Sequence, residues 1–469
     1  MEDFISRSVN SFSKFLSEKE DILNRSKSQN LVISFALPGD NFELTGKIDE
    51  FLNISERSFY LEHPESDFIV VAMDEILNIT ENGDGRFAIT DKKIKEWKDR
   101  IVANHEIIKD RHVPLFIGAM KFTVEHSDNE WKDFNDSTWY VPKIIILKIG
   151  KEQFFIFNFL YSPKSNFYHL TDHLRSKLEY LYKIKGRVKT SELPKIRKIE
   201  GNTPKDKKKW NQMINQALES IEGGWVNKIV LARKVDVLLS GEMKFENVIS
   251  RFRRDYKNCR LFVHRSGKSF FFGATPEVLG KFSNGKVEFD ALAGSAPRGK
   301  DEKEDKEFEK KLLSSEKDKA EHNFVIDHIK NSLSPVCENI TEKENFSVKK
   351  LSNIQHLHTV ISAELKPGNS ILNVLKVIYP TPAICGSPQN EALHLIKKLE
   401  NFKRGLYSGI IGWFNFENEG DFVVALRSAL CSGNKLTAFA GNGIVQNSEP
   451  DAEFAETELK LRPIMSLFR

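Results

Sequence analysis

The sequence has few cysteines, no long apolar run and no excess of one charge. Its four cysteines lie far apart in the chain, at Cys259, Cys337, Cys385 and Cys431. None of them forms a CxxC pair, which argues against a zinc site and against a disulfide framework. No apolar stretch approaches the roughly 20 residues of a membrane-spanning helix. The N-terminus, "MEDFISRSVNSFSKFLSEKED", lacks the apolar core of a secretory signal. These absences predict a cytoplasmic protein with no membrane partner.

The charges are nearly balanced, with 70 Lys and Arg against 66 Asp and Glu. Such a balance gives no global field that would attract nucleic acid. The basic cluster "PKDKKKW" at 204–210 is expected to be solvated surface, so no nucleic-acid partner is predicted. The 469 residues, 40% of them hydrophobic, are enough for a large core or for two or three modest domains. No heptad pattern is visible, and we expect a monomer.

Apolar runs at 30–37, 67–73 and 142–150 predict strands in the first part of the chain. The polar segment 195–210 predicts a boundary between two halves, 1–200 and 201–469. After it, the patterns predict helices at 206–222, 244–257, 301–332 and 388–401, and strands at 228–237, 260–265, 268–273, 278–282 and 286–292. The segments 421–430 and 435–445 are predicted to pair as a hairpin. Strands joined by hairpins and separated by long helices predict an α+β fold with a mainly antiparallel sheet.

The segment "GWVNKIVLARKV" places Lys228 at the start of a predicted strand. Alternation puts Lys228 on one face with Val230 and Ala232, while Ile229 and Leu231 point the other way. Both faces are apolar, which predicts a covered strand and a lysine near a dry interior. Taken alone, such a segment more often indicates the alternative, in which a lysine at the edge of the sheet extends its side chain to water.

Two pairs of acidic residues have helical spacing. Asp318 and Glu321 lie three apart in "SSEKDKAEHNFVIDHI", as do Glu453 and Glu456 in "DAEFAETELK". Each pair would share one face of a helix, and carboxylates from two helices can hold a hard cation such as Mg²⁺. Taken singly, each pair is more readily explained as solvated surface. Glu456, for example, could pair with Lys460 at i+4.

Two further features suggest an anion site. Arg427 is predicted to share a strand face with Val423 and Ala425, so that its guanidinium would leave an apolar surface and suit a carboxylate. The predicted loop "AGNGI" contains Gly441 and Gly443, which would let backbone N–H groups approach an anion closely. An ordinary turn explains the two glycines as well.

Glu277, in "FFGATPEVLGKF", follows a proline and precedes an apolar run. Partial desolvation would raise the pKa of its carboxyl group, which a general acid requires. A carboxylate that faces water at the start of a strand is an equally open interpretation.

Taken in order, these segments resemble the chorismate-utilising enzymes, which are the isochorismate, salicylate, anthranilate and aminodeoxychorismate synthases. The resemblance covers about 205–469 and rests on "KIVLARK", "GATPEVLGKF", "ALAGSAPRG", "SEKDKAEHNFVIDHI", "YPTPAICGSP", "RGLYSGIIGW", "VVALRSA", "AGNGIVQNSEP" and "EFAETELKL". The N-terminal half matches more loosely, through "PLFIGAMKF" and "WYVP".

The resemblance implies one large α+β domain whose two halves pack extended sheets face to face, with helices outside. The variable half would span 1–200 and the chorismate-binding half 201–469. It further implies Mg²⁺ as cofactor, with Glu321 and Glu456 as ligands. Asp318 and Glu453 would support these ligands.

The same resemblance implies a binding site for chorismate. The groups that would hold its carboxylates are Arg427, Tyr407, Lys460 and the backbone at Gly441 and Gly443. Gly294 and Ser295 would line the cleft, and His356 would lie near the reacting ring.

Three positions narrow the choice among the reactions that the resemblance allows. Isochorismate and salicylate synthases carry a lysine as base for the attacking water, where amine-adding relatives have glutamine, and Lys228 matches that lysine. Ala293 occupies the position of the nucleophilic lysine of aminodeoxychorismate synthases. Ala383, in "YPTPAICG", stands where lyase-active relatives have threonine.

The implied protein is therefore a Mg²⁺-dependent isochorismate synthase that adds water at C2 of chorismate and expels the C4 hydroxyl, for menaquinone or siderophore biosynthesis. Lys228 would take a proton from the water while Glu277 protonates the leaving hydroxyl. A base near neutral pH needs a lysine pKa well below about 10.4. Two alternatives stay open: a salicylate synthase, and a non-catalytic relative that binds an aromatic acid or a partner chain.

Overall fold

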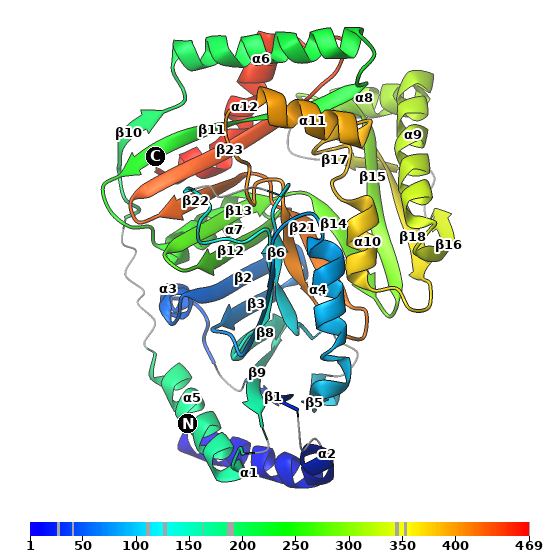
Figure 1. The fold of residues 1–469 in the computed structure, drawn as a ribbon. Helices are drawn as coiled ribbons and strands as arrows, with labels where there is room; N and C mark the ends of the chain where they lie inside the picture. Colours follow the sequence, from blue (N-terminus) through cyan, green and yellow to red (C-terminus); the bar gives the residue numbers. More distant parts are fainter. Residues whose placement is uncertain are drawn as a thin grey trace. The chain divides into compact units, whose positions relative to one another are not determined.

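The computed structural model describes residues 1–25, 29–39, 42–108, 113–124, 129–162, 164–184, 192–342, 347–350 and 354–468. The chain divides into two compact units. The first unit comprises Met1–Glu277, Pro380–Gly412 and Val424–Arg469, and the second comprises Val278–Tyr379 and Trp413–Val423. Both units contain strands and helices, so the fold is mixed α+β with two large sheets, as the sequence predicts (Figure 1).

The first unit contains a long sheet with the strand order β10-β11-β23-β22-β13-β12-β2-β3-β8-β9-β1-β5, in which β19 also pairs with β11. Its pairs run antiparallel, except that β1 and β5 are parallel. The bounds are β10 Ile196–Glu200, β11 Lys228–Leu239, β23 Lys435–Ile444, β22 Ser428–Ser432, β13 Ser269–Thr275, β12 Arg260–Ser266, β2 Arg57–His63, β3 Phe68–Met73, β8 Ile144–Ile149, β9 Glu152–Tyr161, β1 Leu31–Pro38, β5 Ile101–Ala103 and β19 Gly386–Ser387. Strands of this unit that lie outside the long sheet are β4 Leu77–Glu81, β7 Ser137–Val141 and β6 Phe116–Met120, and β20 Ile410–Phe414 begins in it.

Helices cover the long sheet because each has an apolar stripe. In α1, buried side chains recur at three- and four-residue spacing, and Phe12 packs its ring 4.8 Å from Phe35 and 5.1 Å from Phe159. The helix α12 packs against β23 and α6. The helices of this unit are α1 Glu2–Glu18, α2 Glu20–Arg25, α3 Ile48–Asn53, α4 Arg86–Lys95, α5 Phe167–Lys183, α6 Pro204–Glu222, α7 Phe245–Asp255, α11 Gln389–Leu399 and α12 Pro450–Met465.

The second unit contains an antiparallel sheet with the order β16-β18-β15-β14-β21, to which β17 adds by pairing with β18. The helix α9 packs on β15 and β18. The bounds are β14 Val278–Ser283, β15 Lys286–Pro297, α8 Glu302–Ser314, α9 Glu316–Leu333, β16 Cys337–Glu342, β17 Ser347–Lys350, β18 Ile354–Leu365, α10 Ile371–Ile378 and β21 Gly420–Val424.

Most predicted elements are confirmed, and two of them are corrected here. The prediction of one helix over 301–332 is wrong, because Ser315 ends α8 and caps α9 by accepting a hydrogen bond from the N–H of Asp318. The prediction of one strand over 421–430 is wrong as well: it is split into β21 and β22, and β22 forms the hairpin with β23. The predicted boundary segment 195–210 contains β10 and the start of α6, and it lies inside the first unit.

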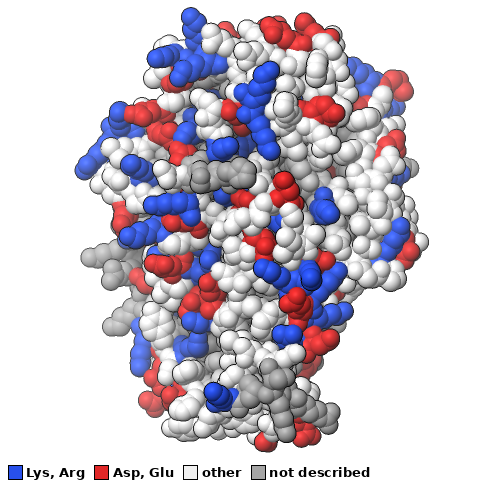
Figure 2. Space-filling model, viewed as in Figure 1, with Lys and Arg blue, Asp and Glu red and all other residues white. Residues whose placement is uncertain are grey.

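Three predictions from composition can be compared with the structure. All four cysteines belong to its described part, where they are free and buried. No helix of the described residues combines the length and the apolar character that crossing a membrane requires. Figure 2 shows Lys and Arg interspersed with Asp and Glu over the face in view, which agrees with the balanced composition.

Candidate active site

The strand β11 begins at Lys228 and is covered on both faces. It pairs with β23 along most of its length and with β19 at Lys228 and Ile229. The following residues, Val230, Leu231 and Ala232, are buried, whereas Lys228 is partly exposed. The prediction of a covered strand is thus confirmed, and Lys228 lies at the N-terminal end of this strand.

Gly441 and Gly443 lie within β23, so the predicted loop at "AGNGI" is wrong. They pair with Ala232 and Val230 of β11 and share one face of the sheet. A Cβ atom at Gly443 would come within 2.8 Å of the Lys228 Cε, and one at Gly441 within 3.0 Å of the Tyr407 Oη. The two glycines therefore leave the space that the Lys228 and Tyr407 side chains occupy.

Glu277 lies immediately before β14 and is the last residue of the segment Met1–Glu277 of the first unit. Its backbone is held by the N–H of Val424, which donates to its carbonyl oxygen at 3.1 Å, and by the hydroxyl of Thr275, which accepts from its N–H at 3.2 Å. Burial raises the pKa of the Glu277 carboxyl group to about 7, although the positive charges of Lys228, Lys460 and Arg427 act in the opposite direction. The expected desolvation is present, and three cationic side chains lie within electrostatic reach of this carboxyl group.

Tyr407 is buried, with 3% of its surface exposed. Its ring stacks on Phe439 with 5.3 Å between ring centroids. Burial holds the pKa of its hydroxyl group far above the ordinary range, so Tyr407 remains a neutral hydrogen-bonding group.

Arg427 does not lie on a strand face, and that prediction is wrong. It occupies the bend between β21 and β22 with a φ of 48°, in the left-handed region. The alternation of side chains that would group it with Val423 and Ala425 stops at the end of β21. Its charge nevertheless acts on Glu277, as described above.

The start of α12 is joined to β23 through Asn442, a residue that the sequence analysis does not single out. The Asn442 Nδ2 donates to the Glu453 Oε2 at 2.9 Å, and its Oδ1 accepts from the Lys460 Nζ at 2.9 Å. Lys460 also donates to the carbonyl oxygen of Gly441 and pairs with the exposed Glu456 at 2.9 Å. The i, i+4 pair that was considered as an alternative for Glu456 is thus present.

The second unit holds the other predicted residues. Gly294 has a φ of +67° at a bulge in β15, and a Cβ atom there would lie 3.0 Å from the Cβ of Asp318 on α9. Next to it, the Ser295 hydroxyl lies 2.8 Å from the Nδ1 of His356, a residue of β18. Glu321 lies on the exposed face of α9. The bulge in β15, the first turn of α9 and His356 thus lie close together within the second unit.

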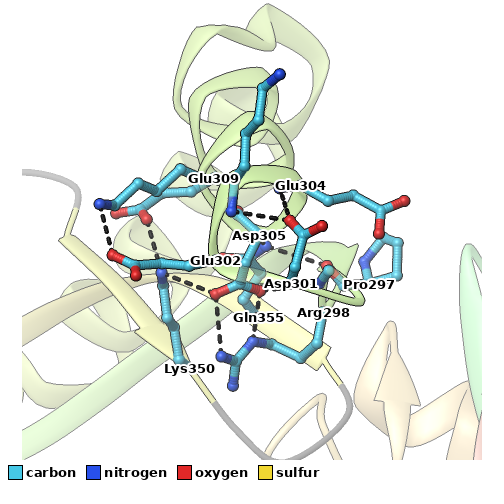
Figure 3. Close-up of polar contacts among 12 residues, drawn as sticks. Pro297, Arg298, Asp301, Glu302, Glu304, Asp305, Glu309, Lys350 and Gln355 are labelled. Carbon is cyan, nitrogen blue, oxygen red and sulfur yellow. Dashed lines mark hydrogen bonds and ion pairs between the residues drawn. The ribbon is translucent and has the colours of Figure 1, made fainter.

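A charged cluster fixes the end of β15 beyond this bulge (Figure 3). Asp305 of α8 accepts two hydrogen bonds from Arg298, at 2.7 and 3.0 Å, and a third from Lys350 of β17 at 3.0 Å. These bonds, those of Arg298 first, hold the pKa of Asp305 far below its usual range. Gln355 of β18 donates to the carbonyl oxygen of Pro297 at 3.0 Å. The strand ends that carry Ser295 and His356 are therefore tied to α8 and β17.

The described residues contain no group of three or more His, Cys, Asp or Glu side chains that could hold a metal ion. Glu453 and Glu456 belong to the first unit, and Asp318 and Glu321 belong to the second. Ala383 is exposed in the turn between α10 and β19.

The first unit therefore brings together seven of the predicted residues around Glu277 and the part of β23 that contains Gly441 and Gly443. These are Lys228, Glu277, Tyr407, Arg427, Gly441, Gly443 and Lys460. An acid of raised pKa, several cations and a neutral hydroxyl make this region suited to a small anionic ligand and to proton transfer.

The family is decided by comparison of the sequence with known proteins. The sequence model described as "Chorismate binding enzyme" matches residues 15–469. This chain belongs to the chorismate-binding enzymes.

Relatives of this chorismate-binding enzyme match over most of their length. The isochorismate synthase MenF of Bacillus subtilis is 29% identical over 415 residues, which are 87% of this chain and 87% of the relative. A salicylate biosynthesis isochorismate synthase of Pseudomonas aeruginosa is 32% identical over 404 residues, which are 86% of this chain and 83% of that protein. The structure of MenF, the menaquinone-specific isochorismate synthase from Escherichia coli, covers 97% of this chain and 100% of its own with a TM-score of 0.77. At 22% identity, that likeness shows the fold alone.

Proposed function

We propose that this chorismate-binding enzyme is an isochorismate synthase, an isomerase that converts chorismate to isochorismate for menaquinone or siderophore biosynthesis. The observation that carries the proposal is the Glu277 carboxyl group, whose pKa burial raises to about 7 within the field of Lys228. Such a carboxyl group can be protonated near neutral pH, and a base and an acid side by side are what the addition of water with loss of hydroxyl requires. The names of the relatives given above support this choice among the reactions of the family.

In the proposed reaction, Lys228 takes a proton from a water molecule that attacks C2 of chorismate. Both ring double bonds shift toward C4, the C4–oxygen bond breaks, and Glu277 supplies the proton with which the C4 hydroxyl leaves as water. One hydroxyl is gained and one is lost, so the product is an isomer and the enolpyruvyl group stays attached. The covered strand excludes bulk water from one side of Lys228.

The substrate carboxylates would be bound by the cations and donors of the first unit: Arg427, Lys460, the Tyr407 hydroxyl and the backbone at Gly441 and Gly443. Partly exposed positive charge and a neutral hydroxyl group suit carboxylates. Within the second unit, the hydrogen bond between Ser295 and His356 orients the imidazole beside the bulge at Gly294. Ala383, which lacks a hydroxyl group, would favour release of isochorismate over elimination of pyruvate.

We also propose Mg²⁺ as the cofactor, with carboxylate ligands among Asp318, Glu321, Glu453 and Glu456. The donors fit the ion in kind, since Mg²⁺ takes carboxylate oxygens from one or two residues and completes its shell with water and substrate. Glu321 and Glu456 are exposed, and the hydrogen bond from Asn442 orients Glu453. When bound, Mg²⁺ would neutralise the ring carboxylate of the substrate.

Glu456→Gln tests the metal assignment. The amide retains the size of the side chain but removes the charge of a hard ligand, so the Mg²⁺ concentration for half-maximal activity should rise by at least about tenfold. The control is Glu458→Gln, two residues along α12, where the carboxylate pairs with Arg233. Identical Mg²⁺ titrations for Glu456→Gln and the unmodified enzyme would contradict the assignment.

Gly443→Ala tests the placement of Lys228. The added Cβ would meet the Lys228 Cε at 2.8 Å and displace its amine, and a misplacement of about 1 Å can cost about 100-fold in rate. We expect kcat to fall by about that factor while the protein stays folded. Gly241→Ala is the control, because a Cβ atom there meets nothing within 4 Å. Equal rates for the two variants would show that the space over Gly443 is not needed.

The function itself is tested by incubating the protein with chorismate and Mg²⁺ and separating the products by chromatography. Isochorismate as the sole product is expected. Salicylate together with pyruvate would identify a salicylate synthase, and unchanged chorismate in the presence of bound ligand would indicate a non-catalytic relative.

A further inference from the structure

A buried ion pair lies directly beside β11. Glu400, which follows the last residue of α11, receives hydrogen bonds from Arg404, whose Nε lies 2.9 Å from Oε2 and whose Nη2 lies 2.5 Å from Oε1. Both side chains are only 2% exposed. Burial by itself lowers the pKa of Arg404, but the charge of Glu400 and its hydrogen bonds raise it above the ordinary value. The guanidinium is therefore charged, and both side chains are almost completely removed from water.

This ion pair lies along the edge of β11 beyond the end of β19, where it makes hydrogen bonds to the β11 backbone. β19 pairs with β11 only at Lys228 and Ile229. Beyond that point, the Arg404 Nη2 donates to the carbonyl oxygen of Val230 at 2.7 Å, and the Glu400 Oε1 accepts from the N–H of Ala232 at 2.8 Å. The two side chains thus supply the donor and the acceptor that a neighbouring strand would supply.

The same guanidinium reaches two other segments. Its Nη1 donates to the carbonyl oxygen of Ile384 at 3.1 Å, in the turn that contains Ala383. Its Cζ atom lies 4.4 Å from the ring centroid of Phe122, and the backbone carbonyl of Arg404 accepts from the N–H of Tyr407 at 2.9 Å. Two segments that carry predicted site residues, β11 and the turn at Ala383, therefore meet at one buried side chain, and the backbone of the same residue holds Tyr407.

A buried ion pair is by itself weak evidence for stability, because desolvation offsets much of the attraction. Its geometric effect is different: the fork of a guanidinium fixes several acceptors at once, which an ammonium group cannot do. In this structure the acceptors are the Glu400 carboxylate and two carbonyl groups in separate segments.

We infer that the Glu400–Arg404 ion pair is a positioning device that holds the first residues of β11, and thereby the Lys228 amine, in register with the turn at Ala383 and with Tyr407. The inference rests on the proposed function for the reaction in which Lys228 takes part. Neither residue touches the reacting atoms; both act through the β11 backbone.

Arg404→Lys is the test, with Arg253→Lys as the matched control. Lysine keeps the charge and can pair with Glu400 but cannot bridge Val230 and Ile384 together. Arg253 likewise donates two hydrogen bonds to a buried glutamate, Glu62, and within the described part of the chain its other hydrogen bond goes to Tyr60, which is not a predicted site residue. Should Arg404→Lys not fold, Glu400→Gln carries the same test, since it removes the charge and retains an acceptor for Ala232.

Two measurements are made on each folded variant. The first is the rate at which acetic anhydride labels Lys228, read by peptide mass spectrometry with Lys234 of the same strand as internal reference. We expect labelling of Lys228 to rise by at least about threefold in Arg404→Lys and to stay unchanged in Arg253→Lys. The second is kcat and KM for chorismate, where we expect kcat to fall by at least about tenfold with KM nearly unchanged.

A comparison in the Lys228→Ala background separates positioning from a general loss of structure. If the ion pair acts through Lys228, Arg404→Lys should lower the residual kcat no further in that background. A loss of the same factor there, or unchanged labelling of Lys228, would overturn the inference. Absence of any product in the unmodified enzyme would instead contradict the proposed function, while the labelling would still decide on the ion pair.

Discussion

Lys228→Ala is expected to lower kcat by about 10²–10⁴-fold, which is the usual contribution of a positioned general base. The water that attacks C2 would then lack a proton acceptor, whereas the groups proposed for the carboxylates would remain. KM for chorismate should therefore change little. The fold should persist, because the backbone of residue 228 is paired with Ser387 whichever side chain it bears. Steady-state kinetics and the midpoint of thermal unfolding measure the two effects.

Lys234→Ala is the control for this variant. Lys234 lies on the same strand, pairs with Glu130, and is six residues from Lys228. Removal of a partly exposed pair should alter stability by no more than about 1 kcal/mol and leave kcat unchanged. An enzyme that retained most of its turnover after Lys228→Ala would not use this lysine as its base.

Glu277→Gln is expected to change activity and stability in opposite directions. The amide cannot donate a proton to the leaving hydroxyl, so kcat should fall by about 10²–10⁴-fold. The same substitution should raise the free energy of unfolding at pH 8, because it removes an acid whose ionisation is disfavoured by burial. A group needed for the reaction would thus be a cost to the fold.

The sign follows from the two pKa values. In the unfolded chain the carboxyl group titrates near 4.5, and in the folded chain its pKa is about 7. Below pH 4.5 both states are protonated and Glu277 has no pH-dependent cost. Between pH 4.5 and 7 the unfolded state loses its proton first, so stability falls as pH rises. Above pH 7 the cost is constant at up to about 3 kcal/mol.

The gain in stability of Glu277→Gln should therefore be absent near pH 4, grow up to about pH 7 and stay level above it, when unfolding is followed by thermal or urea denaturation. Glu307→Gln, at an exposed position of α8, is the control and should show no such dependence. In the unmodified enzyme, kcat/KM should decline as pH rises through about 7, as the acid loses its proton. A stability difference independent of pH would contradict the raised pKa of Glu277.

Elements with strong periodicity could be predicted from the sequence, because alternation and helical spacing reflect burial directly. The strand at Lys228 and the hairpin strands that follow are of this kind. The break at Ser315 escaped prediction because the charged residues on both sides have high helix propensity, while one capping hydroxyl decides the interruption. Arg427 escaped because a left-handed φ at a non-glycine residue leaves no mark in an alternating pattern.

The residues of the candidate site divide in the same way, into those that local sequence predicts and those that it does not. Glu277 could be proposed from a proline and an apolar run, since local sequence predicts its desolvation. Glu400, Arg404 and Asn442 could not, because each acts through partners distant in the sequence. The spacing of Glu400 and Arg404 is that of an ordinary surface ion pair, and only the tertiary structure reveals that both are buried.

The short pairing of β11 with β19 has a consequence for how such a catalyst can diversify. Residue 228 is anchored through its main chain, by the register with Ser387. An exchange of lysine for another polar residue at this position would therefore leave the scaffold in place. A single codon could then redirect the choice of nucleophile without the evolution of a new architecture.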